Sequence, residues 1–164
     1  MPEADERAPR ALLLTAGLGT RLRPLTYVRA KAAVPINGEA LVRRVIRRLA
    51  AAGIAELVLN LHHRPASIAA VVGDGSDLGV SVRYSWEQPV LGSAGGPRRA
   101  LPLLVDSDAE TFLIVNGDTL TDVVHCPFRA HVVDRDITVI DDVQFQRRVD
   151  HRVHVDAARA VLVA

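Results

Sequence analysis

Cysteine is almost absent from this chain, which contains a single one, Cys126, among its 164 residues. One cysteine excludes an intrachain disulfide and a metal site built from several cysteines. It also fits a reducing compartment, so we expect an inert thiol in a cytoplasmic protein. The polar residues 1–10 contain no apolar segment typical of a secretion signal, and no apolar run approaches the length of a membrane span. We therefore expect no membrane association.

The chain also lacks an excess of either charge, because 20 lysine and arginine residues stand against 19 aspartate and glutamate residues. A net charge of +1 produces no field that would attract nucleic acid or an anionic membrane. The composition, 49% hydrophobic and 24% charged, is that of an ordinary globular domain with one core. We expect one domain and neither a nucleic-acid nor a membrane partner.

The most informative stretch is an apolar strand expected over residues 11–15, followed at once by Gly17, Gly19 and Arg21. A strand that ends in such a loop can present backbone N–H groups to a phosphate. We expect the glycines to permit positive φ and to leave no Cβ between backbone and ligand, while the arginine offers a planar fork of donors. The alternative for an isolated Gly-x-Gly is a tight turn without a ligand.

Two well-known phosphate-binding motifs are excluded by what this stretch lacks. No Gly-Lys-Ser or Gly-Lys-Thr follows the glycines, so the loop is not a P-loop. The third glycine of a dinucleotide-binding fingerprint is missing as well.

Strands and helices are expected to alternate along the rest of the chain. Apolar residues at helical spacing predict a helix over residues 40–52, ended by Gly53, with its arginines on a solvated face. We expect strands at 56–61, 80–86 and 111–115, a short helix at 68–72, and a helix at 98–104 after a loop at 92–96. This alternation predicts an α/β fold with a mostly parallel sheet.

Polar and aromatic side chains near the strand ends suggest further roles. Asp118 follows the last of these strands, where open α/β sheets bind ligands, and a carboxylate there favours Mg²⁺, although a lone aspartate more often caps a helix. His62 and His63 have no Asp or Glu at metal-ligand spacing, so we expect a helix-cap or surface role. We expect Trp86 to pack rather than to stack on a base.

Three motifs in a fixed order indicate a family. The first comprises residues 14–26 with Lys31 and the Val-Pro-Ile of residues 34–36, the second residues 87–96, and the third residues 112–122. In this order they resemble the sugar-phosphate nucleotidylyltransferases, and most of all the mannose-1-phosphate guanylyltransferase-like branch. The resemblance covers about residues 11–123.

This resemblance implies a Rossmann-like three-layer α/β/α sandwich with a mostly parallel sheet, C-terminally incomplete in this chain. It implies that a sugar-1-phosphate oxygen attacks the α-phosphorus of a nucleoside triphosphate and expels pyrophosphate, with Mg²⁺ as cofactor. Because that nucleophile is already anionic, the reaction needs cations and N–H donors rather than a general base.

The family's site residues match positions of this chain. Arg21 and Lys31 match the residues that grip the triphosphate, and Asp118 matches the metal-binding aspartate, so these three are the expected catalytic residues. The other expected nucleotide-binding positions are Leu14, Ala16, Gly17, Gly19, Thr20, Gly92 and Ser93. The last two belong to the loop that closes over the base and the sugar.

The chain departs from the family pattern in two places. Prolines usually flank the lysine, but Ala30 and Ala32 flank Lys31, which predicts a less rigid segment. Residues 124–164 show no clear period apart from apolar runs at 137–140 and 161–163, and they match neither the family's sugar-phosphate lysine nor its second metal-binding aspartate. We expect a lead-in at 1–10, a nucleotidyltransferase domain at 11–123 and an atypical tail at 124–164, such as truncation or a shifted reading frame would produce.

Two functional hypotheses follow from these observations. The first is an enzyme that makes a nucleotide sugar from a nucleoside triphosphate and a sugar-1-phosphate. The second is a catalytically incomplete nucleotide-binding or regulatory module with the same fold. Detection of product distinguishes them, whereas the nucleobase, the sugar and self-association into a homo-oligomer are left open by the sequence.

Overall fold

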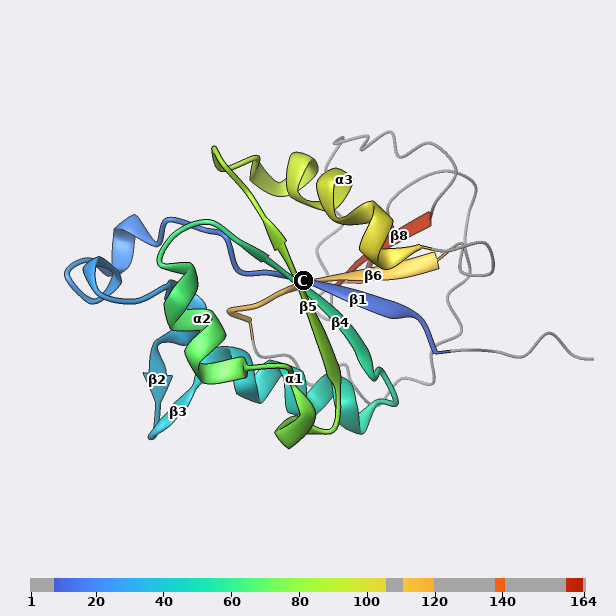
Figure 1. Ribbon diagram of the computed structural model, residues 1–164, viewed down its shortest axis with the longest axis horizontal. Coiled ribbons are helices and arrows are strands. Elements are labelled where there is room, and N and C mark those ends of the chain that lie inside the picture. Colours follow the sequence, from blue (N-terminus) through green and yellow to red (C-terminus); the bar gives the residue numbers. More distant parts are fainter. Residues whose placement is uncertain (1–7, 106–110, 120–137, 141–158, 164) are drawn as a thin grey trace, which may run out of the picture.

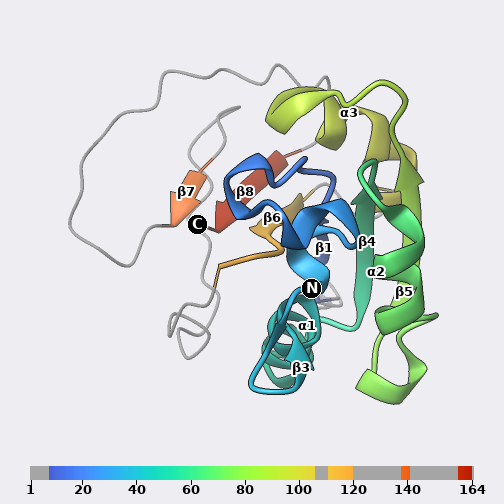
Figure 2. The ribbon, with the colours of Figure 1, turned by 90° about the vertical axis from the view of Figure 1, so that its left-hand side faces the viewer.

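A computed structural model describes residues 8–105, 111–119, 138–140 and 159–163 of the chain. The strands of its main sheet are β1 Arg10–Leu14, β4 Glu56–Leu61, β5 Ser81–Trp86, β6 Thr111–Asn116, β7 Thr138–Ile140 and β8 Arg159–Val163. They form a six-stranded sheet in the order β5-β4-β1-β6-β8-β7, and every neighbouring pair is parallel (Figure 1; β7 is seen in Figure 2). The predicted α/β fold with a mostly parallel sheet is confirmed.

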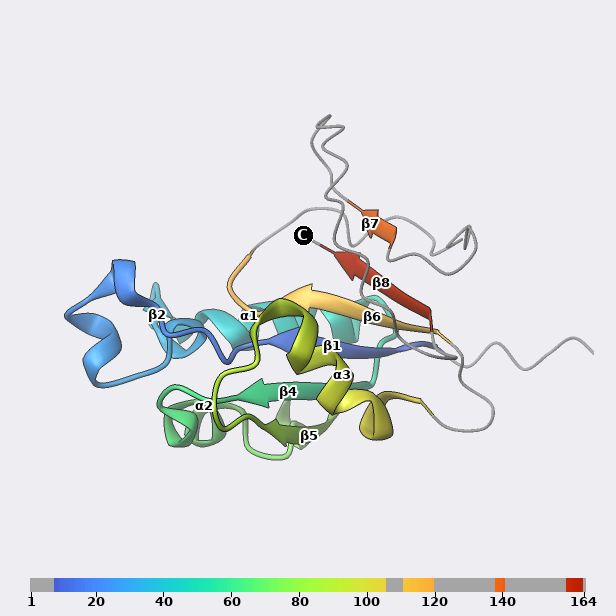
Figure 3. The same cartoon turned by 90° about the horizontal axis from the view of Figure 1, so that it is seen from above.

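Helices cover both faces of this sheet (Figure 3). Helices α1 (Leu41–Ala51) and α2 (Pro65–Val72) pack on one face, and α3 (Gly92–Leu104) packs on the other. Figure 2 shows the sheet running from β5 at one edge to β7 at the other. These three layers are the α/β/α sandwich that the resemblance implied.

Strand β1 is buried on both of its faces. Leu13 belongs to the core cluster beneath α1 and α2, whereas Leu12 belongs to the cluster beneath α3. Both side chains are fully buried. A strand covered on both faces needs apolar residues at consecutive positions, which explains the uninterrupted apolar run at the start of the first motif.

Helix α3 begins earlier than predicted, because residues 92–96 form its first turns rather than a loop. Gly96 is buried, and a Cβ at this position would lie 2.5 Å from Glu87 Oε1 and 2.9 Å from Asn60 Nδ2. The helix therefore approaches the ends of β4 and β5 closely at a residue without a side chain. This tertiary packing outweighs the low helix propensity of glycine.

A small hairpin that the sequence analysis missed precedes α1. Its strands β2 (Pro35–Ile36) and β3 (Glu39–Ala40) are antiparallel. Asn37 and Gly38 join them, both with positive φ, 51° and 81°. Such a turn matches the twist of the two strands, and Asn-Gly is its strongest sequence signal. The hairpin could therefore have been predicted from these two residues.

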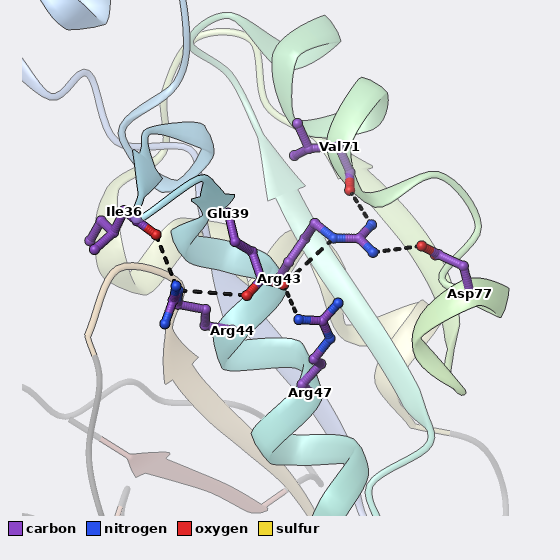
Figure 4. Close-up of polar contacts among 7 residues, drawn as sticks. All are labelled: Ile36, Glu39, Arg43, Arg44, Arg47, Val71 and Asp77. Atoms are coloured by element: carbon purple, nitrogen blue, oxygen red, sulfur yellow. Dashed lines mark hydrogen bonds and ion pairs between the residues drawn. The ribbon is translucent and has the colours of Figure 1, made fainter.

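Three arginines of α1 converge on one carboxylate of this hairpin (Figure 4). Arg43, Arg44 and Arg47 all form ion pairs with Glu39, and the distance from Arg44 Nε to Glu39 Oε2 is 3.6 Å. The shared carboxylate holds the hairpin against the start of α1. We call these four residues the arginine cluster.

Two of these arginines also bind other segments. Arg43 donates to the backbone carbonyl of Val71 at 2.8 Å and to Asp77 Oδ2 at 2.6 Å, and Arg44 donates to the carbonyl of Ile36 at 2.9 Å. The prediction of a solvated arginine face is therefore wrong for Arg43 and Arg44, which are half-buried, and holds for the exposed Arg47. The apolar face of α1 is confirmed by its buried residues, Leu41, Val42, Val45, Ile46 and Leu49.

The C-terminal part of the chain contributes two strands to the sheet. Strands β7 and β8 coincide with the apolar runs noted at 137–140 and 161–163, and β8 pairs with β6 from Arg159 to Val163. Cys126 lies outside the described residues. Among the described residues, no helix is both long enough and apolar enough to cross a membrane.

The substitution Glu39→Gln tests the arginine cluster. Removing the charge leaves three cations without their shared carboxylate, so we expect the free energy of unfolding to fall by about 1 kcal/mol at low salt. The loss should shrink at about 1 M NaCl, because salt screens partly exposed charges. Urea unfolding at both salt concentrations measures the effect, with Arg99→Gln as the control, because this exposed arginine forms no ion pair with the described residues. Equal stability of the wild type and Glu39→Gln at low salt would contradict this role.

Candidate functional site

The candidate site lies at the carboxyl ends of β1 and β6, which are adjacent in the sheet. From β1 the chain continues to β4 and β5 on one side, whereas β7 and β8 follow β6 on the other side. The loops after β1 and β6 therefore diverge, and such a reversal of strand order is where open α/β sheets bind ligands. The glycine loop and Asp118, predicted as parts of one site, both lie at this edge of the sheet.

The loop after β1 carries backbone donors of two kinds. The N–H groups of Thr15 and Ala16 donate to Asn60 Oδ1, at 2.6 and 3.3 Å, so the protein itself engages them. The N–H groups of residues 17–21 make no hydrogen bond within the part of the chain that the structure describes. A run of free N–H groups after a strand is suited to bind phosphate oxygens. Ala16, a predicted nucleotide-binding position, has no free N–H to contribute.

The two glycines of this loop serve different purposes. Gly19 has a φ of +61°, and a Cβ there would lie 2.7 Å from Thr26 Cγ2. The prediction of positive φ is therefore confirmed for Gly19. It is wrong for Gly17, which does not have positive φ and has no atom within 4 Å of its would-be Cβ. At Gly17 the missing side chain instead leaves open space beside the free donors.

Arg21 lies on a short 3-10 helix, Thr20–Leu22, directly after these glycines. Its side chain is exposed and makes no ion pair or hydrogen bond with the described residues. Thr20, also a predicted nucleotide-binding position, is exposed beside it. A guanidinium offers five donors, and at the end of a run of N–H groups without partners among the described residues it is suited to bind an anion.

Lys31 and Asp118, which were predicted separately, form an ion pair at the carboxyl ends of β1 and β6. The lysine side chain is 37% exposed and the aspartate side chain 25%, so both can meet a ligand. Asp118 is brought there by Gly117, whose N–H donates to the carbonyl of Leu14 at 3.1 Å. Leu14, another predicted site residue, thus contributes its carbonyl to joining the ends of the two strands.

The segment around Lys31 is held in place without the flanking prolines of the family. Lys31 opens a 3-10 helix, Lys31–Ala33, in which Ala32 and Ala33 are buried against the core. The N–H of Ala30 donates to Ser67 Oγ at 2.8 Å, which ties the segment to α2. Packing and a hydrogen bond between distant segments therefore supply a constraint at Lys31 that the local sequence does not.

The first residues of α3 lie at the same edge of the sheet, because the helix follows the carboxyl end of β5. Gly92, predicted to contact the nucleotide, is exposed and has a φ of +72°. The side chain of Ser93, predicted with it, lies outside the described part of the chain. The free N–H groups of a helix N-terminus favour a negatively charged ligand.

Four polar residues that were not predicted as part of the site form hydrogen bonds to the segments around it. They are Asn60, His62, His63 and Glu87. Asn60 and Glu87 are buried between the β1 loop and α3. His62 Nδ1 donates to the carbonyl of Glu87 at 2.9 Å, and His63 Nε2 donates to the carbonyl of Thr26 at 2.6 Å. Of the two roles predicted for the histidines, the helix-cap role is wrong, whereas their partial exposure agrees with the surface role. The available signal for Asn60 was a single polar residue within the otherwise apolar run of residues 57–61.

Trp86 also differs from its prediction, because the residue is 56% exposed at the end of β5 rather than packed. β5 is the edge strand of the sheet, so one side of its last residue has no neighbouring strand to cover it. The alternation that marked the strand could not show that the strand lies at an edge.

A family model described as Nucleotidyl transferase matches residues 10–139. The chain belongs to this family. The match includes all three sequence motifs and reaches beyond residue 123, where those motifs end. The resemblance stated from the motifs is thereby confirmed.

The chain is similar to curated relatives whose names differ. It is 42% identical over 115 residues to an N-acetylmuramate alpha-1-phosphate uridylyltransferase from Neisseria meningitidis serogroup B, covering 70% of this chain and 48% of the relative. It is 38% identical over 111 residues to a mannose-1-phosphate guanylyltransferase from Mycobacterium tuberculosis, covering 68% and 30%. The chain thus spans about half or less of the length of these relatives, whose names differ in nucleotide and in sugar.

Among solved structures, HddC from Yersinia pseudotuberculosis complexed with GMP-PN is similar with a TM-score of 0.59 and 26% identity, covering 68% of this chain and 48% of that one. A UDP-glucose pyrophosphorylase complexed with UDP-glucose is similar with a TM-score of 0.51 and 17% identity, covering 58% and 41%. The second likeness concerns the fold alone. Both agree with the Rossmann-like arrangement of the sheet.

The substitutions Gly19→Ala and Gly17→Ala form a matched pair in the loop. Alanine at position 19 must adopt positive φ and meets Thr26, so we expect the free energy of unfolding to fall by about 1–2 kcal/mol. Alanine at position 17 meets nothing, so we expect a change below about 0.5 kcal/mol. Urea unfolding measures both values. Equal losses at the two positions would show that the loop does not have this backbone conformation.

Proposed function

We propose that the chain binds a nucleoside triphosphate at the carboxyl ends of the adjacent strands β1 and β6. We further propose that the protein transfers the nucleotidyl group of this triphosphate to a sugar-1-phosphate. The observation that carries this proposal is the convergence of three anion-binding features at one edge. They are the free N–H groups of residues 17–21, the guanidinium of Arg21, and the ammonium of Lys31. Membership of the nucleotidyl transferase family supports the proposal, as do the names of the two relatives.

The chemistry proposed is an in-line displacement at phosphorus. An oxygen of the sugar-1-phosphate attacks the α-phosphorus of the triphosphate, the new phosphorus–oxygen bond forms, and the bond to the leaving pyrophosphate breaks. The attacking oxygen is already anionic at neutral pH, so no proton has to be removed. The protein has to hold two polyanions together and offset the charge that develops on the leaving group.

The residues at the edge suit these tasks. Arg21 presents a planar fork that matches two phosphate oxygens, whereas Lys31 presents a compact charge. The N–H groups of residues 17–21 are held by the backbone, so they need no reorganisation to receive an anion. A preorganised donor of this kind is typically worth about 3 kcal/mol in the transition state.

Mg²⁺ enters the proposal as a counter-ion of the triphosphate. Asp118 offers one partly exposed carboxylate, and the described residues include no group of three or more His, Cys, Asp or Glu that could hold a metal alone. This donor set fits Mg²⁺, which is commonly bound through one or two carboxylates together with substrate phosphates and waters. When bound, Mg²⁺ neutralises negative charge on the phosphates.

Two further points belong to the same proposal. The single cysteine supports a reducing compartment such as the cytoplasm. The names of the relatives divide between uridylyl and guanylyl transfer, so we propose the reaction class and leave base and sugar to experiment.

The substitution Arg21→Ala should weaken binding of the nucleoside triphosphate at least about tenfold, because a charged, two-pronged contact is lost. The free energy of unfolding should change by less than about 0.5 kcal/mol, since the side chain is exposed. Titration calorimetry in the presence of Mg²⁺ measures the affinity. Arg99→Ala, at an exposed arginine of α3, is the matched control and should bind like the wild type. Unchanged affinity in Arg21→Ala would remove this residue from the site.

A panel of sugar-1-phosphates tests the reaction itself. We expect Mg²⁺-dependent release of pyrophosphate from a nucleoside triphosphate with one member of the panel, and at least about a hundredfold slower release in Asp118→Asn. Asparagine keeps the size of the side chain and removes the charge that attracts the metal. Tight triphosphate binding without product across the panel would instead favour the nucleotide-binding or regulatory module.

A further inference from the structure

A chain of buried polar groups joins the loop after β1 to the start of α3. Asn60, at the end of β4, accepts the N–H groups of Thr15 and Ala16 through Oδ1 and donates through Nδ2 to Glu87 Oε1 at 2.8 Å. The second oxygen of Glu87, Oε2, accepts the N–H of Leu91 at 2.9 Å. Asn60 and Glu87 are each only 3% exposed.

The donors and acceptors of this pair permit only one arrangement. Because a backbone N–H can only donate, Asn60 must turn its side-chain oxygen toward the β1 loop, and its NH₂ group then faces Glu87. Glu87 must offer an acceptor on that side and another toward Leu91, and its two side-chain oxygens provide them. A buried polar network in which every member is paired holds its neighbours rigidly.

Contacts of the same two residues extend this arrangement. The hydroxyl of Thr15 donates to the backbone carbonyl of Asn60 at 2.5 Å, and His62 Nδ1 donates to the backbone carbonyl of Glu87. Gly96 packs so closely on both side chains that a Cβ would collide with them. The β1 loop and the first turns of α3 thus meet at one pair of side chains.

We propose that Asn60 and Glu87 are positioning residues that set the phosphate-binding loop relative to the N-terminus of α3. The free N–H groups of residues 17–21 follow directly after Thr15 and Ala16, and α3 starts directly after Leu91. The pair is buried, so it acts on a bound nucleotide only through these two segments. The nucleotide part of this inference rests on the proposed function.

Stability alone does not account for a pair of this kind. Burying a carboxylate carries a desolvation cost, and an apolar pair of similar size serves stability as well or better. The polar pair adds direction, because each atom of the two side chains faces one particular segment. A role in orientation therefore explains the residue types, whereas a role in packing does not.

Exchange of the two functional groups tests the proposal. Asn60→Asp places two carboxylates face to face, and Glu87→Gln places a donor where only acceptors fit. The double variant Asn60→Asp/Glu87→Gln has the same net charge as the wild type. It can form every hydrogen bond again, with residue 87 now donating to residue 60. Its carboxylate accepts from Thr15, Ala16 and the new amide group, whose oxygen accepts from Leu91.

Amide hydrogen exchange on the full chain without ligand is the first readout. In Glu87→Gln we expect the amides of Thr15 and Ala16, which Glu87 does not touch, to exchange at least about tenfold faster. In Asn60→Asp we expect the same of Leu91, and in the double variant a return to within about threefold of the wild type. Val72→Ala, at the buried last residue of α2, controls for general loss of stability and should not single out these amides. Faster exchange only at amides bonded directly to the changed side chain would overturn the proposal.

Affinity for a nucleoside triphosphate is the second readout, measured on variants whose folding circular dichroism verifies. Each single variant should bind at least about tenfold more weakly, and the double variant should recover to within about threefold. If the single variants bind like the wild type while Arg21→Ala binds weakly, the pair is structural and the proposal is overturned. If the wild type binds no nucleoside triphosphate, the proposed function fails, and the exchange rates alone decide whether the pair sets the two segments.

Discussion

The close approach of Gly117 to the end of β1 is the constraint on which the site depends. Its N–H donates to the carbonyl of Leu14, and a Cβ at this position would lie 2.6 Å from Thr15 Cγ2 and 2.9 Å from Leu14 O. Only glycine lets the loop after β6 run this close to the loop after β1. Asp118 follows at once and thereby reaches Lys31. Without this approach the loop after β1 and the carboxylate of Asp118 would both lie at the carboxyl ends of the strands but would not come together.

The two faces of the sheet support this edge by different means. On the face of α1 and α2, the arginine cluster and the bond between Ala30 and Ser67 hold the hairpin and the Lys31 segment. On the other face, Glu87 and Gly96 hold the start of α3 against β4. The loop after β1 lies between these supports, and its N–H groups at residues 17–21 have no hydrogen-bond partner among the described residues. Backbone groups left unpaired at the surface are then available to an anion.

Much of the fold was predictable because its signals are local. Periodicity predicted β4 with its observed bounds, Glu56–Leu61, and α1 to within a residue at each end, with Gly53 after it. The side-chain period of a strand or helix depends only on neighbouring residues and on which face is buried. The motifs likewise indicated the family, and through the resemblance they singled out Arg21, Lys31 and Asp118 as expected site residues.

What the sequence alone determined is therefore the alternation of the main strands and helices from β1 to β6, their apolar faces and the family. The tertiary structure decided which chemical groups are free and which are engaged. Only the fold shows that Asn60 accepts the N–H groups of Thr15 and Ala16, whereas those of residues 17–21 have no partner in the described part of the chain. Only the fold shows that Arg43 and Arg44 are engaged by distant partners, and that residues 92–96 join α3. The physical reason is that hydrogen-bond pairing and close approach are set between segments far apart in the chain, where no local pattern records them.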